Sequence, residues 1–327
     1  MHPHRKKIIT LLASFGICAS SLGYCQTAQS KLSVTPEKGL KSKQAQEPAE
    51  FLRVIETSDG QPQALQTALT RYKPADESVI VDLIGAVHIG EGDYYERLNK
   101  QFELYDVVLY ELVAPKGTRI PKGSKKSSTN PIGFLQKSAQ NMLGLQSQLE
   151  MIDYQKDNFV HADMSPTEIG EKMEERGDTA FSVGFSALSE MMKNQKGLSK
   201  QLGTNSGESI FELMGNPLKM KQMMASQFTQ QGALEMGLGS KLNQMLITDR
   251  NAAAMQVLKK EIAKGHKKIA IFYGAAHMPD FEKRLERDFG MTRTKQAWLD
   301  SWDLTKAPKK KSSGTANMLF NLMKQID

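Results

Sequence analysis

The apolar residues of this chain follow two patterns, uninterrupted runs and a helical spacing of three to four. Apolar side chains fill nearly every position of three segments, 79–87, 107–112 and 269–276. Such runs are typical of strands that are covered on both faces, as in a parallel sheet. Between the first two runs, Leu98 and Phe102 fall on one helical face. A strand, a helix and a second strand in this order predict a βαβ unit, whose two strands run parallel.

The other segments predict a hairpin before this unit and helices after it. Strands at 51–57 and 64–72 flank the turn-rich segment SDGQPQ, and NFVHADM at 158–164 resembles a short strand. Helical spacing and helix-end residues predict helices at about 132–150, 166–176, 180–195, 208–214, 217–236, 247–265 and 279–290. The predicted fold class is therefore α/β, a central, largely parallel or mixed β-sheet flanked by helices, with a Met-rich helical insertion at about 130–246.

The N-terminal segment predicts export. Residues 1–25 join a positively charged start to a short apolar stretch, which is typical of a secretory signal and is too short to span a bilayer. We therefore expect a periplasmic or secreted protein without a transmembrane span in the mature chain. Cleavage after Gly23 and cleavage after Cys25 both fit the sequence. A lipoprotein anchor at Cys25 is not expected, because Tyr24 stands where a small residue is needed.

The formal charge of +7 does not indicate a nucleic-acid partner, because the charge lies at the ends of the chain. The predicted signal holds Arg5, Lys6 and Lys7, and the basic tail at 306–327 holds five lysines and one acidic residue. The body of the chain is therefore near neutral, and we expect no nucleic acid to bind it. We divide the chain into a signal at 1–25, a disordered linker at 26–50, one α/β domain at 51–305 and the tail.

A short motif occurs twice where an apolar run ends. GAVH at 85–88 and GAAH at 274–277 each precede a predicted helix, so Gly85 aligns with Gly274 and His88 with His277. We expect the glycine to allow backbone angles or close approaches that a Cβ would prevent. Ligands of open α/β sheets bind at this carboxyl edge. Two copies in one context favour a functional role over the hydrogen-bonded structural role that a single histidine usually has.

Glu111 ends the strand that follows His88, so both side chains are expected on the same sheet edge. If the last strand runs parallel to these two, His277 joins them. Imidazole and carboxylate groups bind divalent metals such as Mn, Co or Zn, and a metal site with an open position lowers the pKa of bound water. Equally, one histidine and Glu111 can activate water without a metal. Glu111 can also be an ordinary strand-end residue.

Four further polar residues are candidates for the same site. His161 and Asp163 lie two apart, so that in a strand they share a face. Arg250 and Asn251 lie in the first turn of a predicted helix, where an arginine is unfavourable for the helix dipole but can bind a carboxylate. The alternatives are a turn role for Asp163 and a surface salt bridge for Arg250.

These motifs resemble the TraB/GumN/Tiki superfamily over about 75–115 and 245–290. The resemblance rests on the two Gly-x-x-His motifs, on Glu111, and on Arg250 in ITDRNAAAMQVLKKEI before the second motif. It implies an α/β fold related to erythromycin-esterase-like and haem-binding ChaN-like proteins. Tiki members look like divalent-metal-dependent proteases, whereas other branches limit peptide pheromones or have no established activity. Superfamily membership therefore does not decide the reaction.

The leading functional hypothesis is an exported hydrolase, a metal-dependent peptidase that acts on a peptide or protein. His88, His277 and Glu111 would bind Mn, Co or Zn or activate water, and Arg250 would orient a substrate carboxylate or stabilise developing negative charge. His161, Asp163 and Asn251 would extend the site. The alternative is a non-catalytic protein that sequesters a peptide or haem with the same histidines.

Overall fold

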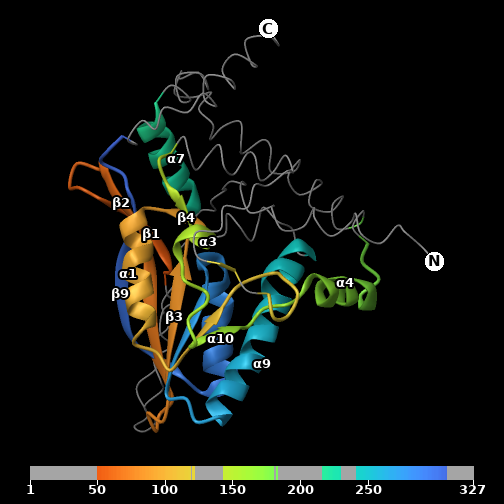
Figure 1. The fold of residues 1–327 in the computed structure, drawn as a ribbon. Coiled ribbons are helices and arrows are strands. Elements are labelled where there is room, and N and C mark those ends of the chain that lie inside the picture. The colour runs from red at the N-terminus through yellow and green to blue at the C-terminus, as the bar shows by residue number, and fades with distance from the viewer. Residues whose placement is uncertain are drawn as a thin grey trace, which may run out of the picture.

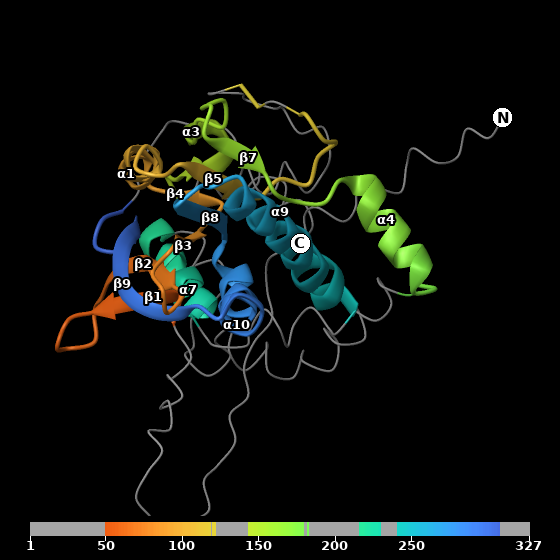
Figure 2. The same cartoon turned by 90° about the horizontal axis from the view of Figure 1, so that it is seen from below.

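The computed structural model describes residues 50–118, 120–121, 143–179, 182, 216–229 and 241–307. Within these residues, seven strands form the main sheet: β1 (Leu52–Glu56), β2 (Pro62–Lys73), β3 (Ile80–Ala86), β5 (Val107–Tyr110), β7 (Phe159–His161), β8 (Lys268–Gly274) and β9 (Thr292–Asp303). Their order is β1-β2-β3-β8-β5-β7, with β9 paired to β2 (Figure 2). The sheet is mixed and flanked by helices, which confirms the α/β class.

The parallel part of the sheet places β8 between β3 and β5. Ala86 pairs with Gly274, and Tyr110 pairs with Phe272, so all three strands end at the same edge. Helix α1 (Gly92–Phe102) connects β3 to β5, which run parallel as predicted but leave room for one strand between them. This arrangement brings the two Gly-x-x-His motifs, which lie far apart in the sequence, to one edge of the sheet.

Helices cover both faces of the sheet (Figures 1 and 2). On one face, α1 packs its buried residues Tyr94, Leu98 and Phe102 against Ile84 and Phe272. On the other face, α9 (Asp249–Ala263) and α10 (Met278–Phe289) pack against alternate residues of the same strands. Burial on both faces explains why the central strands read as continuous apolar runs.

The antiparallel part of the sheet contains the predicted hairpin, β1 and β2, and a strand that the sequence did not predict. β9 pairs with β2 over most of its length, from Thr292 opposite Lys73 to Asp303 opposite Ala64. Its first half is mostly exposed or half-buried, and its sequence TRTKQAWLDSWD carries no apolar run. Strands at a sheet edge need only one partner and one covered face, so hydrophobic patterning detects them poorly.

The remaining elements lie outside the main sheet and the three helices named above. They are β4 (Ile89–Gly90), β6 (Gln146–Ser147), α3 (Gln148–Met151), α4 (Pro166–Glu175), α7 (Pro217–Thr229), the π-helix η3 (Gln244–Thr248) and the 3-10 helix η4 (Ala275–His277). β4 pairs with β6 in a small second sheet. The helix predicted at 132–150 is wrong at 143–147, where the chain forms a turn and β6 instead.

The predictions for the other helices agree with the described residues. Helix α4 begins with a capping box, in which the Ser165 hydroxyl accepts from Glu168 N and the Glu168 carboxylate accepts from Ser165 N. Helix α9 is followed by Gly265, whose φ of 95° is left-handed. The predicted helix at 208–214 and the signal fall outside the described residues, as do the predicted helix at 180–195 except for residue 182, the linker except for residue 50, and most of the tail.

None of the described helices is both long enough and apolar enough to cross a membrane.

Candidate functional site

The three residues predicted at strand ends meet around one glycine of β8. A Cβ built on Gly274 would lie 3.4 Å from Glu111 Oε2 and 3.8 Å from both His277 Cδ2 and His88 Nε2. The distance between His277 Cδ2 and His88 Nε2 is therefore at most twice 3.8 Å. His88 is exposed, whereas the His277 side chain is buried. The strand order explains the meeting, because β8 runs parallel to β3 and β5 and lies between them.

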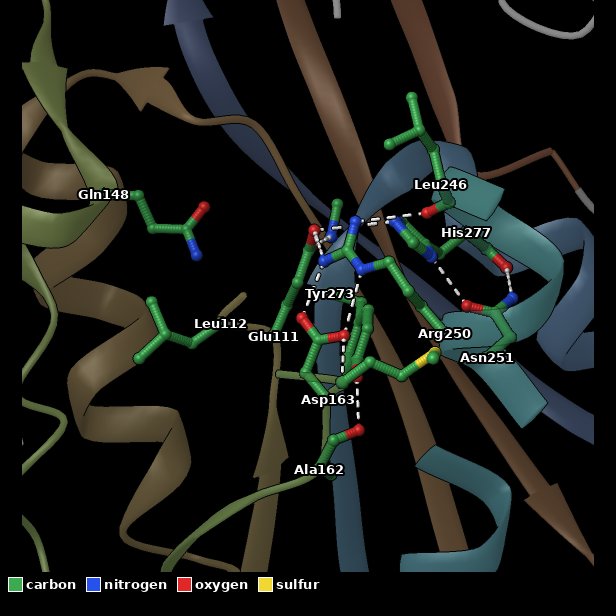
Figure 3. A network of polar contacts seen from close by, with 12 residues as sticks. Glu111, Leu112, Gln148, Ala162, Asp163, Leu246, Arg250, Asn251, Tyr273 and His277 are labelled. Carbon is green, nitrogen blue, oxygen red and sulfur yellow. Dashed lines mark hydrogen bonds and ion pairs between the residues drawn. The ribbon is translucent and has the colours of Figure 1, made fainter. Parts of the chain in front are cut away.

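His277 is held by Asn251, the third residue of α9. The Asn251 amide nitrogen donates to the His277 carbonyl at 3.0 Å and to Asp280 Oδ2 at 2.8 Å. Its oxygen, 2.6 Å from His277 Nδ1, therefore accepts the proton of that nitrogen. Nε2 of His277 then faces Glu111 Oε1, which lies 3.5 Å away. Figure 3 shows the His277 ring with Asn251 to its right and Glu111 to its left.

Glu111 is held in one orientation by contacts at both oxygens. Oε1 accepts a hydrogen bond from Arg250 Nη2 at 2.6 Å, and Oε2 accepts one from the backbone N–H of Gly274 at 2.7 Å. Burial by itself would raise the pKa of Glu111, but the charge of Arg250 and the nearby rings of His277 and His88 hold this pKa well below its ordinary value. Glu111 is therefore a carboxylate at neutral pH.

Arg250 connects Glu111 to Asp163 (Figure 3). Its Nε and Nη2 donate to the two oxygens of Asp163 at 2.9 and 2.7 Å, and Nη1 donates to the Leu246 carbonyl at 3.1 Å. The Asp163 side chain is fully buried, and that of Arg250 is 8% exposed. All three guanidinium nitrogens thus contact acceptors of the protein, whereas we expected Arg250 to bind a substrate carboxylate.

The structure separates the other two candidates that lie close in sequence, His161 and Asp163. β7 ends at His161, so the argument that both share a strand face does not hold. Nε2 of His161 lies 2.6 Å from the Leu112 carbonyl, and no contact of this ring reaches Glu111 among those described. Asp163 accepts hydrogen bonds from Arg250, and Asn251 contacts the ring of His277.

The two motif glycines do not have the backbone role that we expected. Gly274 has a φ of −52° and a ψ of 141°, which any residue can adopt, and Gly85 is absent from the residues of positive φ. A Cβ at either position would meet only ordinary van der Waals distances. The two positions differ in the neighbours that a Cβ would meet. A Cβ at Gly85 would contact Ala275 and the Ala68 carbonyl, whereas a Cβ at Gly274 would enter the space among His88, Glu111 and His277.

Two groups at this edge, an imidazole and a carboxylate, are of the kinds that bind divalent cations. Nε2 of His277 and the ionised carboxylate of Glu111 face each other, and such a pair needs a proton or a cation between its two atoms. Their 3.5 Å separation is close to that of two atoms bound to one ion at about 2 Å each. As positioned, no three His, Cys, Asp or Glu side chains within the described ranges form a metal-binding group.

Sequence reasoning missed two residues beside this network. Tyr273 of β8 donates its buried hydroxyl to the Ala162 carbonyl and thereby fixes the segment that carries Asp163. Gln148 of α3 points its amide toward Glu111 (Figure 3). The alternation of β8 would have assigned Tyr273 to a face of the sheet, but Gln148 lies in a polar segment without any pattern.

Comparisons of the chain with protein-family models, with curated proteins and with solved structures found no match. The resemblance to the TraB/GumN/Tiki superfamily therefore stays a prediction from the two motifs.

Proposed function

We propose that this chain is a hydrolase of the divalent-metal-dependent peptidase type, with His88, His277 and Glu111 as the residues that hold the cation. One observation carries this proposal, His277 Nε2 facing the ionised Glu111 at 3.5 Å while Asn251 occupies Nδ1. Metal-binding histidines commonly donate their second ring N–H to an oxygen of the protein in this way. A bound Mn, Co or Zn ion would lower the pKa of water and supply hydroxide near neutral pH.

The other residues of the site position these three groups. Asn251 fixes the orientation and the tautomer of His277. Arg250 keeps Glu111 ionised and, together with the Gly274 N–H, fixes both carboxylate oxygens. Because Arg250 is buried and bonded to Asp163 as well, we assign it a positioning role rather than contact with the substrate. His88 lies at the solvent side, where a substrate would approach.

The metal part of the proposal is tested by calorimetry. Protein treated with a chelator is titrated with Mn²⁺, Co²⁺ and Zn²⁺, and we expect one site that His277→Ala and His88→Ala each abolish. His266→Ala is the control, because His266 is another partly exposed histidine but pairs with Glu261, away from the site. Equal binding by the wild type and His277→Ala would show that His277 does not hold the cation.

The hydrolytic part is tested separately, with a random octapeptide library and detection of new peptide ends. We expect cleavage that depends on the added cation and disappears in Glu111→Gln. If the protein instead retains peptide or haem in stoichiometric amounts without cleaving the library, it is a sequestering protein and the peptidase proposal is wrong.

We also propose that the protein is exported by means of residues 1–25. The support is the sequence pattern alone, a basic start followed by a short apolar stretch. Expression of the full chain in a secreting bacterial host, followed by mass spectrometry, should yield a product that lacks the first 23 or 25 residues. An intact N-terminus on protein retained in the cytoplasm would contradict this proposal.

A further inference from the structure

Gln148 carries a hydrogen-bond acceptor that is buried and has no partner. The residue is 4% exposed, and its Oε1 is the one buried side-chain oxygen or nitrogen without a hydrogen bond in the described part of the chain. Its Nε2 donates to the Tyr154 hydroxyl at 2.9 Å, so the amide is already oriented. Buried polar atoms are nearly always paired, because an unpaired one has lost its water without compensation. An unpaired Oε1 therefore points to a ligand.

Several contacts place this oxygen at the site described above. The backbone N–H of Gln148 donates to the carbonyl of His88 at 2.9 Å, and the preceding residue, Ser147, pairs with Ile89. The hydroxyl of Tyr154, which accepts from Gln148, is also close enough to Glu111 for the two groups to interact. The pKa of Tyr154 is raised mainly by burial. The hydrogen bond from Gln148 lowers this pKa, and the negative charge of Glu111 raises it further.

Figure 3 shows Gln148 entering from the side of the site opposite Arg250, with its amide directed toward Glu111. The site thus has Arg250 and His277 on one side and the neutral amide of Gln148 on the other.

We propose that Gln148 Oε1 accepts a hydrogen bond from a backbone N–H of a peptide bound at this site. The inference rests on the proposed function and deepens it by naming the group of the substrate that is recognised. An acceptor selects a ligand that carries a donor, and each residue of a peptide other than proline offers an N–H. Haem presents carboxylates, which are acceptors, so Gln148 favours a peptide over haem as the ligand.

The test uses the full-length protein, the random octapeptide library and the Gln148→Leu variant. The library member that binds the wild type most tightly is resynthesised with each backbone N–H in turn replaced by N–CH₃. We expect one replacement to weaken binding to the wild type by roughly fivefold to tenfold, the effect of one hydrogen bond. The same replacement should leave the affinity of Gln148→Leu unchanged, because this variant has no acceptor to lose.

Gln101→Leu is the matched control. Gln101 of α1 also donates its Nε2 to a tyrosine hydroxyl, that of Tyr105 at 3.2 Å, but it lies at the end of the helix remote from His88. This variant should distinguish the methylated peptide from its parent as the wild type does. Thermal melting of all three proteins establishes that they are folded.

The outcomes separate this inference from the function on which it rests. A wild type that binds and cleaves peptides but is indifferent to every methylation overturns the role of Gln148 alone, whether or not the variant folds. Equal discrimination by the wild type and Gln148→Leu has the same meaning. A wild type that binds no member of the library overturns both proposals.

Discussion

Arg250 lies between two buried carboxylates, Glu111 and Asp163, that would otherwise repel each other. The guanidinium contributes a hydrogen bond to Glu111 and two to Asp163. Burial opposes its charge, but the two carboxylates raise its pKa above the ordinary value. Three charges removed from water are tolerated only as a group, because each unpaired charge would carry a large desolvation cost.

Replacing Arg250 by methionine should therefore destabilise the protein strongly. The variant keeps the aliphatic volume but leaves both carboxylates without their partner, and we expect the free energy of unfolding at pH 7 to fall by about 3–5 kcal/mol. Arg287→Met, which breaks an exposed pair with Asp288, is the control and should change nothing measurable. Urea unfolding of the three proteins measures this, and equal stability of both variants would contradict the argument.

The stability of the metal-free protein should also depend on pH through Glu111. Its pKa is lower in the folded chain than its ordinary value of 4.5, so its ionisation stabilises the fold above that value, and this contribution is lost as the pH falls toward the folded pKa. We expect the stability difference between the wild type and Glu111→Gln to be largest near neutral pH and to shrink below about pH 4.5. Urea unfolding with a chelator present, at pH 3 to 7, measures it. Parallel curves would exclude Glu111 as the cause.

At the scale of elements, β8 assembles the site. It lies between β3 and β5, so its end meets the ends of both neighbours. The sequence predicted the three strands, and the shared edge of β3 and β5, because buried parallel strands have a clear pattern. It left the direction and the place of β8 open, since a strand from a distant part of the chain can insert between β3 and β5 without any local signal.

Gly274→Ala tests whether β8 leaves open space at this edge for a ligand. The backbone angles of Gly274 allow alanine, so the free energy of unfolding should change by less than about 1 kcal/mol. The new methyl group would stand among Glu111, His88 and His277, and we expect cation and peptide binding to weaken at least severalfold. Gly85→Ala, at the equivalent position of the first motif, should fold and bind normally. Calorimetry compares the two variants, and normal binding by Gly274→Ala would show that this space is not used.

At the scale of the whole molecule, contacts between residues that are distant in the sequence determine which side chains surround the site, and local sequence patterns do not reveal these contacts. His88, Glu111 and His277 were identified from strand ends, but Arg250 and Glu111 form their contact across 139 positions of the chain. Gln148 gave no signal because it lies in a polar segment, and its importance comes only from a missing partner in the folded structure. β9 was missed because edge strands do not need a continuous apolar pattern.

β9 also reaches the loop that carries His88, and this contact gives the last prediction. Trp302 is fully buried and donates its indole N–H to the Ile89 carbonyl at 2.7 Å, while the Ser301 carbonyl accepts from Glu91 N at 2.9 Å. Trp302→Ala should lower the free energy of unfolding by about 3–5 kcal/mol, as large core truncations do. Because the loop loses its support, the affinity of the site for a cation or a peptide should fall as well.

The other tryptophan of the chain, Trp298, provides the control from the same strand. It is half-buried and packs beneath the guanidinium of Arg53, which lies 4.0 Å from its ring. Trp298→Ala should cost less stability and leave ligand affinity unchanged, because its contact is made outside the His88 loop. Urea unfolding and calorimetry on both variants distinguish a general loss of stability from a loss transmitted to the site. If Trp302→Ala is destabilised but binds as tightly as the wild type, β9 supports the fold and not the position of His88.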